Sequence, residues 1–201
     1  MKLYDKSECP FCWKVRIAIA EASVTAEIFD SQSFDNINDW QALTPRKTVP
    51  VLTVDSTIIY ESNVILEYLH DSTKKLLGTR IDERIQARLM NQYSDIVIGA
   101  GIREVIFEKR NKAKQEWDLQ RIKMGIEMFE QALEYLSEQL ANKDFFADSY
   151  SFAECALTAR FGLAQAYGVE IPTRFPNLID WFERMKLRSS YKRTAPKICL
   201  I

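Results

Sequence analysis

The chain of 201 residues changes character near residue 75, and this change limits the folds that are open to it. Before that point, short strand-like runs alternate with helical segments. From about Ile81 onward, apolar residues recur every three or four positions, which is the spacing of one face of a helix. The longest such series runs through residues 122–140. The sequence therefore predicts an α+β domain over residues 1–75 and an all-helical domain over residues 81–201, joined within Asp71–Arg80.

The expected elements of the first domain follow the order βαβ, then α, then ββα. A βαβ unit places its two strands parallel with a right-handed crossover, and a closing hairpin adds antiparallel strands. The sheet is therefore expected to be mixed. The expected strands are Lys2–Tyr4, Ala26–Phe29, Val51–Val54 and Thr57–Tyr60, and the expected helices are Pro10–Glu21, Phe34–Leu43 and Ser62–His70.

Helix signals alone mark the second domain. Ser151 and Glu154 form a capping-box pattern ahead of a helix over Cys155–Tyr167. A proline at the first position predicts a last helix over Pro176–Leu187. No internal repeat is present, so the two domains are not copies of one unit.

The charge balance and the cysteine usage exclude several classes of protein. Lys plus Arg number 27 and Asp plus Glu number 28, so the net charge is −1 and attraction to nucleic acid or to an anionic membrane is not expected. No apolar run approaches the ~20 residues of a membrane span, and the N-terminus lacks the pattern of a signal peptide. Four cysteines with one close pair do not form the framework of a secreted disulfide scaffold. We therefore expect a cytoplasmic protein.

The reactive chemistry is concentrated in Cys9-Pro10-Phe11-Cys12, at the start of the first expected helix. A thiol at a helix N-terminus faces unpaired N–H groups and the positive end of the helix dipole, and both favour the thiolate. This spacing lets the second thiol reach the first within one turn, so Cys9 is predicted to be the nucleophile and Cys12 the resolving thiol. Half of a zinc site is the alternative. Zinc needs four ligands, whereas the chain has one His and no second close Cys pair, so we expect no metal.

Four pieces of sequence together resemble a cytosolic glutathione S-transferase over essentially the whole chain. They are the strand–CPFC–helix opening, Thr48–Leu52, Tyr60–Asn63 and the capping box Ser151–Glu154. The Cys-Pro-Phe opening resembles the cysteine-type, omega-like and glutaredoxin-like bacterial members. This resemblance implies a thioredoxin-like first domain that holds glutathione, a hydrophobic co-substrate bound between the domains, and a homodimer.

The resemblance also assigns a glutathione site to residues of the first domain. Val49 and Pro50 match the cis-proline position, whose backbone can pair with an extended peptide; an ordinary trans proline is the alternative from the residues alone. Glu61 and Ser62 match the pair that holds the γ-glutamyl end, and the alternative is a helix cap at Ser62 beside a first-turn charge. The other assigned residues are Phe11 and, for the glycyl carboxylate, Lys47, with Arg46 as the second candidate.

Such a site offers Cys9 three reactions. They are exchange with a protein–glutathione mixed disulfide, reduction of a small oxidant such as dehydroascorbate, and conjugation of a small electrophile. A thiolate beside the glutathione sulfur tends to form a mixed disulfide with it, which favours the redox reactions. The alternative is a non-enzymatic regulator, because Tyr60–Leu69 also resembles stringent starvation protein A, which binds RNA polymerase. However, Asp71–Gly78 has neither Pro nor His, whereas that family carries a Pro/His-rich segment there.

The long helix expected from Asp82 borders the electrophile pocket in the family that the chain resembles. Gly99 and Gly101 are expected to interrupt this helix, because each costs about 1 kcal/mol there relative to Ala. The pocket candidates on it are Tyr93, Ile96 and Val97, although core packing is the favoured role for any one of them. The arginines that hint at a dimer interface are Arg84, Arg88 and Arg103, and the alternative is that they are simply solvated.

Three further residues have structural interpretations. His70 is expected to be partly exposed at a helix end, where the dipole favours a cation. Cys155 lies among Ala and Leu and is expected to be a buried small side chain, whereas Cys199 is expected to be exposed near the terminus.

Overall fold

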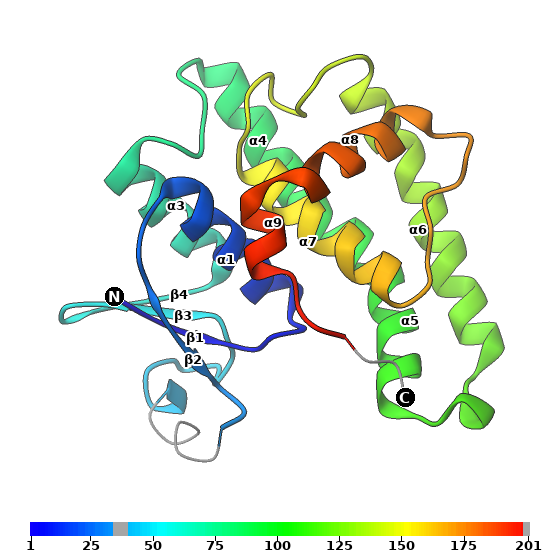
Figure 1. The fold of residues 1–201 in the computed structure, drawn as a ribbon, viewed down its shortest axis with the longest axis horizontal. Coiled ribbons are helices and arrows are strands. Elements are labelled where there is room, and N and C mark those ends of the chain that lie inside the picture. Colours follow the sequence, from blue (N-terminus) through cyan, green and yellow to red (C-terminus); the bar gives the residue numbers. More distant parts are fainter. Residues whose placement is uncertain (34–39, 199–201) are drawn as a thin grey trace.

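The computed structural model describes residues 1–33 and 40–198, with a small sheet at one side and a helical domain at the other (Figure 1). The strand order is β2-β1-β3-β4. Strand β1 pairs parallel with β2 and antiparallel with β3, and β3 pairs antiparallel with β4. The predicted mixed sheet is therefore confirmed. The strands are β1 (Lys2–Asp5), β2 (Glu27–Asp30), β3 (Val51–Val54) and β4 (Thr57–Tyr60).

Helices α1 (Pro10–Ala22) and α3 (Ser62–Thr73) pack together in the thioredoxin-like domain. The chain then passes into the helical domain, whose first helix begins at Ile81. Its elements are α4 (Ile81–Tyr93), the π-helical turn η2 (Ser94–Ile98), α5 (Gly99–Asn111), the 3₁₀ turn η3 (Lys114–Glu116), α6 (Leu119–Leu140), α7 (Phe152–Ala166), α8 (Pro176–Leu187) and α9 (Ser189–Thr194).

Helix α1 is buried by both domains, which explains its nearly continuous apolar sequence. The indole of Trp13 packs on Gly162 of α7, and its Nε1 donates a hydrogen bond to Thr194 Oγ1 at 3.0 Å. Arg188, at the end of α8, donates two hydrogen bonds to the carboxylate of Glu21, at 2.8 and 2.7 Å. These contacts hold α1 of the first domain against the helical domain near both of its ends.

The backbone before α3 departs from the sequence expectation. Ser62 is the first helical residue rather than the cap, and Glu61 holds the cap position without a side-chain cap bond. The φ angle of Glu61 is 63°, a left-handed conformation that few non-glycine residues adopt. The expected helix over Phe34–Leu43 falls largely on residues 34–39, outside the described residues.

The capping box of the helical domain is confirmed. Ser151 Oγ accepts a hydrogen bond from the Ala153 N–H, and the carboxylate of Glu154 accepts one from the Ser151 N–H at 2.8 Å. Burial raises the pKa of Glu154 to about 7, although the hydrogen bonds from Phe146 and Ser151 favour its ionised form. The start of α7 is thus set by a polar group that the core encloses completely.

Gly99 and Gly101 do not interrupt the long helix, contrary to expectation. The chain leaves α-helical geometry earlier, at the π-helical turn Ser94–Ile98, and α5 begins at Gly99. Gly101 instead allows α5 and α6 to approach closely, because a Cβ there would lie 2.6 Å from the carbonyl oxygen of Gly125. The absence of a side chain at Gly101 therefore allows α5 to pack against α6 and does not produce a bend.

His70 is buried rather than partly exposed, and its ring packs at right angles to that of Phe152 from α7. Cys155 is fully buried, as predicted, and Cys199 lies outside the described residues. Within the described ranges, no helix is both long enough and apolar enough to cross a membrane.

We predict that Gly162→Ala lowers the free energy of unfolding by about 1–3 kcal/mol, the usual cost of overpacking. The added Cβ would lie 2.3 Å from Cη2 of Trp13, a rigid ring atom that cannot move aside without disturbing α1. Urea unfolding followed by Trp fluorescence measures the change. A gain in stability, which Gly→Ala normally gives inside a helix, would contradict this packing.

Candidate active site

Cys9 occupies the N-cap of α1, with Pro10 at the first helical position. Its side chain is partly exposed, whereas Cys12, one turn further along, is fully buried. The cap position places the Cys9 thiol among the unpaired N–H groups of the first turn. Cys9 is therefore the accessible thiol of the pair and Cys12 the sheltered one.

The pKa values of the two thiols move in opposite directions. The hydrogen bond from the Cys12 thiol, together with the N–H groups of Cys12 and Phe11 and the charge of Arg160, lowers the pKa of Cys9 to about 7 against the effect of burial. Burial, and then the neighbouring Cys9, raise the pKa of Cys12 well above its usual range. Near neutral pH a large fraction of Cys9 is therefore ionised, whereas Cys12 stays protonated and donates its hydrogen bond.

A cavity of about 390 Å³ lies between the loop before β3 and the start of α3, and we call it the peptide cavity. The Val49–Pro50 bond at its edge is cis, as the matched position implies. The predicted glutathione residues that line the cavity are Phe11, Val49, Pro50, Glu61 and Ser62. Lys47 does not line it. Arg46, the second candidate, does, and its guanidinium lies 3.1 Å from the Glu61 carboxylate.

A second cavity, of about 450 Å³, borders Cys9 and is called here the Cys9 cavity. Phe11, Asp95 and Ile96 line both cavities, so the two adjoin on one side of α1. Of the three pocket candidates, only Ile96 faces these cavities; the Tyr93 hydroxyl donates to the Ala132 carbonyl at 3.0 Å instead. The arrangement offers one site for an extended peptide and another for a second molecule.

Three buried charges join the domains beneath the cavities, and sequence reasoning missed them. The ammonium of Lys14 lies 2.6 Å from Asp95 in η2, and Arg160 of α7 lies 3.7 Å from the same carboxylate. Lys14 also donates to Asn63 at 2.7 Å and to Asn91 at 3.1 Å. The signal available was a lysine inside the apolar run of α1 and an arginine inside the Ala-rich α7.

Arg160 connects this cluster to the cysteine. Its guanidinium lies 4.7 Å from the centre of the Phe11 ring, and it lines the Cys9 cavity. The space for it comes from Gly99, where a Cβ would lie 2.8 Å from the guanidinium carbon. Gly99 is therefore needed to keep a buried cation near the thiolate.

A thioredoxin-like domain joined to a helical domain, with a cysteine at the start of α1, defines the class of glutathione-transferase-fold proteins. Two family models match: the glutathione S-transferase N-terminal domain over residues 8–72 and the C-terminal domain over residues 108–184. Together they match more than half of the sequence. The chain belongs to the glutathione S-transferase family.

The relatives agree with this assignment. Maleylacetoacetate isomerase of Dictyostelium discoideum is 29% identical over 192 residues, which is 87% of this chain and 83% of that protein. Glutathione S-transferase 2 of Saccharomyces cerevisiae is 27% identical over 210 residues, which is 96% of this chain and 88% of that protein. The theta class glutathione S-transferase of Xanthomonas axonopodis pv. citri, solved with glutathione bound, shares the fold with a TM-score of 0.88. The two sequences are 19% identical, and the match covers 98% of this chain and 97% of that structure.

We predict that iodoacetamide alkylates Cys9 first, with a rate that is half-maximal near pH 7. A free thiol titrates near pH ~8.5, so the lowered pKa moves the rise of the curve to lower pH. Peptide mass spectrometry distinguishes the two thiols, and urea-unfolded protein supplies the unshifted reference. Earlier labelling of Cys12, with Cys9 inert, would reverse the assignment of roles.

Proposed function

We propose that the chain is a cysteine-type glutathione transferase that acts as a thiol–disulfide oxidoreductase, with Cys9 as the nucleophile. The observation that carries the proposal is the position of Cys9, whose lowered pKa favours the thiolate and which borders one cavity that adjoins a second through Phe11. Family members with Tyr or Ser at this position stabilise the glutathione thiolate by a hydrogen bond, whereas a cysteine can form a disulfide with it.

Glutathione would occupy the peptide cavity. Its α-carboxylate would meet the N–H groups at the start of α3 and the Ser62 hydroxyl, and its α-amino group the Glu61 carboxylate. The backbone of Val49 would pair with the cysteinyl unit, and Arg46 would meet the glycyl carboxylate. The solved theta class enzyme from Xanthomonas axonopodis pv. citri, which has the same fold and was solved with glutathione bound, supports glutathione as the ligand.

The exchange would proceed in two balanced steps. The Cys9 thiolate attacks the glutathionyl sulfur of a mixed disulfide, a Cys9–glutathione bond forms, and the other thiol leaves as a thiolate that takes up a proton. A second glutathione thiolate then attacks the glutathionyl sulfur of that bond, giving oxidised glutathione and releasing the Cys9 thiolate. Cys12 donates its hydrogen bond to the Cys9 thiolate before the first attack and again when the second step releases it. The comparisons do not favour the RNA-polymerase-binding alternative.

We expect Cys9→Ser to lose glutathione-dependent reduction of hydroxyethyl disulfide, measured by coupling to glutathione reductase. Cys12→Ser should keep the activity, because this chemistry needs one thiol and Ser still donates a hydrogen bond. Cys12→Ala should raise the pH of half-maximal rate by about one to two pH units, the effect of removing a hydrogen bond to a charged group.

Calorimetric titration with glutathione is the control for these variants. Cys9→Ser must still bind glutathione and melt like the parent protein if only the nucleophile has been removed. Full activity of Cys9→Ser would refute the proposal, and so would failure of the parent protein to bind glutathione.

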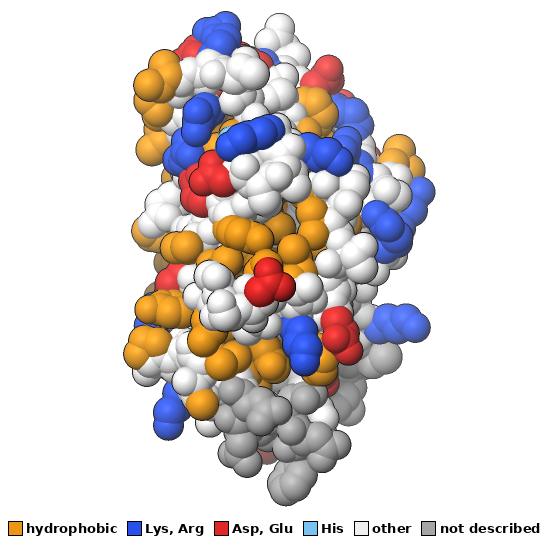
Figure 2. Space-filling view, turned by 90° about the vertical axis from the view of Figure 1, so that its left-hand side faces the viewer, with side chains coloured by type: hydrophobic (Ala, Val, Ile, Leu, Met, Phe, Trp, Pro, Cys, Tyr) orange, Lys and Arg blue, Asp and Glu red, His pale blue; other side chains and the backbone are white. Residues whose placement is uncertain are grey.

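We also propose a homodimer that pairs the first domain of one copy with α4 of the other. Ile81, Ile85 and Leu89 recur every four residues on α4 and are each more than half exposed. Exposed Ile58, Tyr60 and Val64 supply an apolar surface on the first domain. Figure 2 shows hydrophobic side chains gathered on the side of the molecule where the β3–β4 hairpin and α3 lie. Such a patch on both elements suits an isologous interface.

Two of the three arginines expected at this interface, Arg88 and Arg103, have partners or positions within their own chain. Arg88 donates two hydrogen bonds to Glu67 of its own chain, both at 2.7 Å, and Arg103 lines the Cys9 cavity. Light scattering at micromolar concentration should give twice the chain mass of 23.4 kDa. Ile85→Glu, on the exposed stripe, should give the monomer mass with an unchanged circular dichroism spectrum. A parent protein that stays at the chain mass at every concentration would exclude the dimer.

A further inference from the structure

Another cavity lies inside the helical domain, between α6, α7 and α8, and we call it the helical cavity. Its volume is about 190 Å³. None of its lining residues borders the Cys9 cavity or the peptide cavity, so it is separate from the candidate active site. The apolar lining residues are Phe129, Phe161, Ala164, Val169, Ile171, Ile179 and Phe182, and the polar ones are Gln165, Glu170 and Glu183.

The walls of the helical cavity suit an aromatic or aliphatic group. Phe129, Phe161 and Phe182 are only 0–3% exposed, so their rings are shielded from water. Protein interiors are usually packed without voids larger than a water molecule. An apolar cavity of about 150 Å³ stays dry and takes up benzene. The helical cavity is larger than that, so it can accept one benzene-sized group.

The edge of the cavity already holds one ammonium group, that of Lys186 on α8. Its Nζ lies 2.7 Å from a carboxylate oxygen of Glu183 and 3.4 Å from the side-chain oxygen of Gln165. It also lies 5.2 Å from the centre of the Phe182 ring, within the range of a cation–π interaction. All three partners line the cavity. The edge therefore offers a carboxylate, an amide oxygen and an aromatic ring to a cation.

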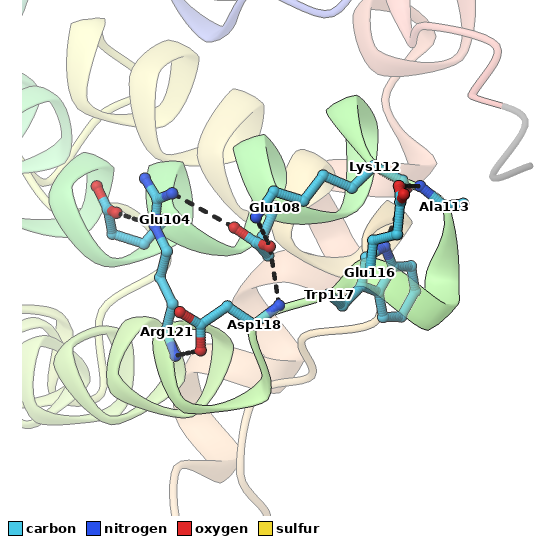
Figure 3. A network of polar contacts seen from close by, with 8 residues as sticks. All are labelled: Glu104, Glu108, Lys112, Ala113, Glu116, Trp117, Asp118 and Arg121. Carbon is cyan, nitrogen blue, oxygen red and sulfur yellow. Dashed lines mark hydrogen bonds and ion pairs between the residues drawn. The ribbon is translucent and has the colours of Figure 1, made fainter.

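A second carboxylate at this edge has no cation. Glu170 accepts a hydrogen bond at 3.3 Å from the side-chain amide of Gln165, and no Lys or Arg among the described residues forms an ion pair with it. Glu104 and Glu108 differ in this respect, because Arg121 pairs with both, at 2.7 and 3.3 Å (Figure 3). The edge of the helical cavity thus has more carboxylates than cations.

Lys186 is held at this edge by contacts that water can reach. Its side chain is 24% exposed and that of Glu183 is 59% exposed, and an ion pair open to water is weak. The flexible stem of a lysine lets its ammonium turn out into solvent. A ligand ammonium could make the same contacts while its apolar part fills the cavity. Lys186 is therefore an internal competitor that such a ligand can displace.

We propose that the helical cavity binds small aromatic ammonium ions, with the ring of the ligand among the three Phe side chains. The ligand ammonium takes the place of the Lys186 ammonium beside Glu183, and Glu170 is the second carboxylate. Aromatic side chains bind organic ammonium ions in this way. The inference goes beyond the proposed function and does not depend on it, because the helical cavity shares no residue with the site around Cys9.

Removing the internal competitor gives the sharpest test, with benzylammonium as the probe and benzyl alcohol as its neutral counterpart. We expect Lys186→Met to tighten binding of benzylammonium about twofold to fivefold, the range of an exposed ion pair. Binding of benzyl alcohol should change less than about twofold, since its apolar contacts remain. Ligand-observed NMR titration measures both affinities in the full chain.

Matched variants locate the site. Glu170→Gln should weaken binding of benzylammonium about twofold to fivefold and leave benzyl alcohol unchanged. Ala164→Leu places extra side-chain volume in the cavity and should weaken binding of both probes about tenfold or more. Lys192→Met, which removes an exposed charge from α9 outside the cavity, should change neither affinity. Melting curves show whether each variant remains folded.

The outcomes decide between this proposal and the proposed function. Failure of both the parent protein and Lys186→Met to bind benzylammonium would overturn the ammonium site, and so would an affinity that Lys186→Met leaves unchanged. Equal effects of Glu170→Gln on the two probes would also overturn it. Glutathione binding is measured on the same samples. A protein that binds benzylammonium as expected but fails to bind glutathione would support the helical cavity and refute the proposed function.

Discussion

The ammonium of Lys14 is buried where the two domains meet, and the site depends on the carboxylate that neutralises it. Its side chain is 1% exposed, so an unpaired charge there would be strongly destabilising. Burial lowers the pKa of Lys14, and Asp95 works against that effect. Asp95 comes from the helical domain, whereas Lys14 comes from the thioredoxin-like domain. Removing Asp95 would leave the buried Lys14 without a carboxylate, at a cost of about 3–5 kcal/mol, whereas without Lys14 the Asp95 carboxylate would keep Arg160 at 3.7 Å.

This pairing also determines where the cavities lie. Asp95 belongs to the π-helical turn between α4 and α5, a local geometry that often marks functional sites in helices. Its carboxylate faces Lys14 and Arg160, and Ile96 beside it borders both cavities. The cavity that adjoins Cys9 therefore forms only when the domains are docked. The contacts that stabilise the junction between the domains are therefore also needed to complete the site.

Most of the helices and strands follow from local signals in the sequence. The arginines that line the Cys9 cavity do not. The strand bounds Val51–Val54 and Thr57–Tyr60, the capping box at Ser151 and the proline at the start of α8 were predictable, because each depends on neighbouring residues. The position of Cys9 at the N-cap of α1 was predictable for the same reason. Arg110 and Arg160, which line the Cys9 cavity, were not, since their positions depend on which side of a helix meets the other domain. Gly99 was misread for the same reason: its effect lies in space given to a residue 61 positions away.

The contact between Gly99 and Arg160 predicts how these two positions differ among related sequences. A side chain at position 99 would displace the Arg160 guanidinium, because even a Cβ comes within 2.8 Å of its carbon. Conversely, a glycine at 99 without an arginine at 160 would leave a void beside Phe11. The two positions should therefore vary as a pair during evolution, Gly with Arg or a larger residue with a smaller neutral one. Such paired variation would let a sequence alone tell which family members keep a buried cation beside the reactive cysteine.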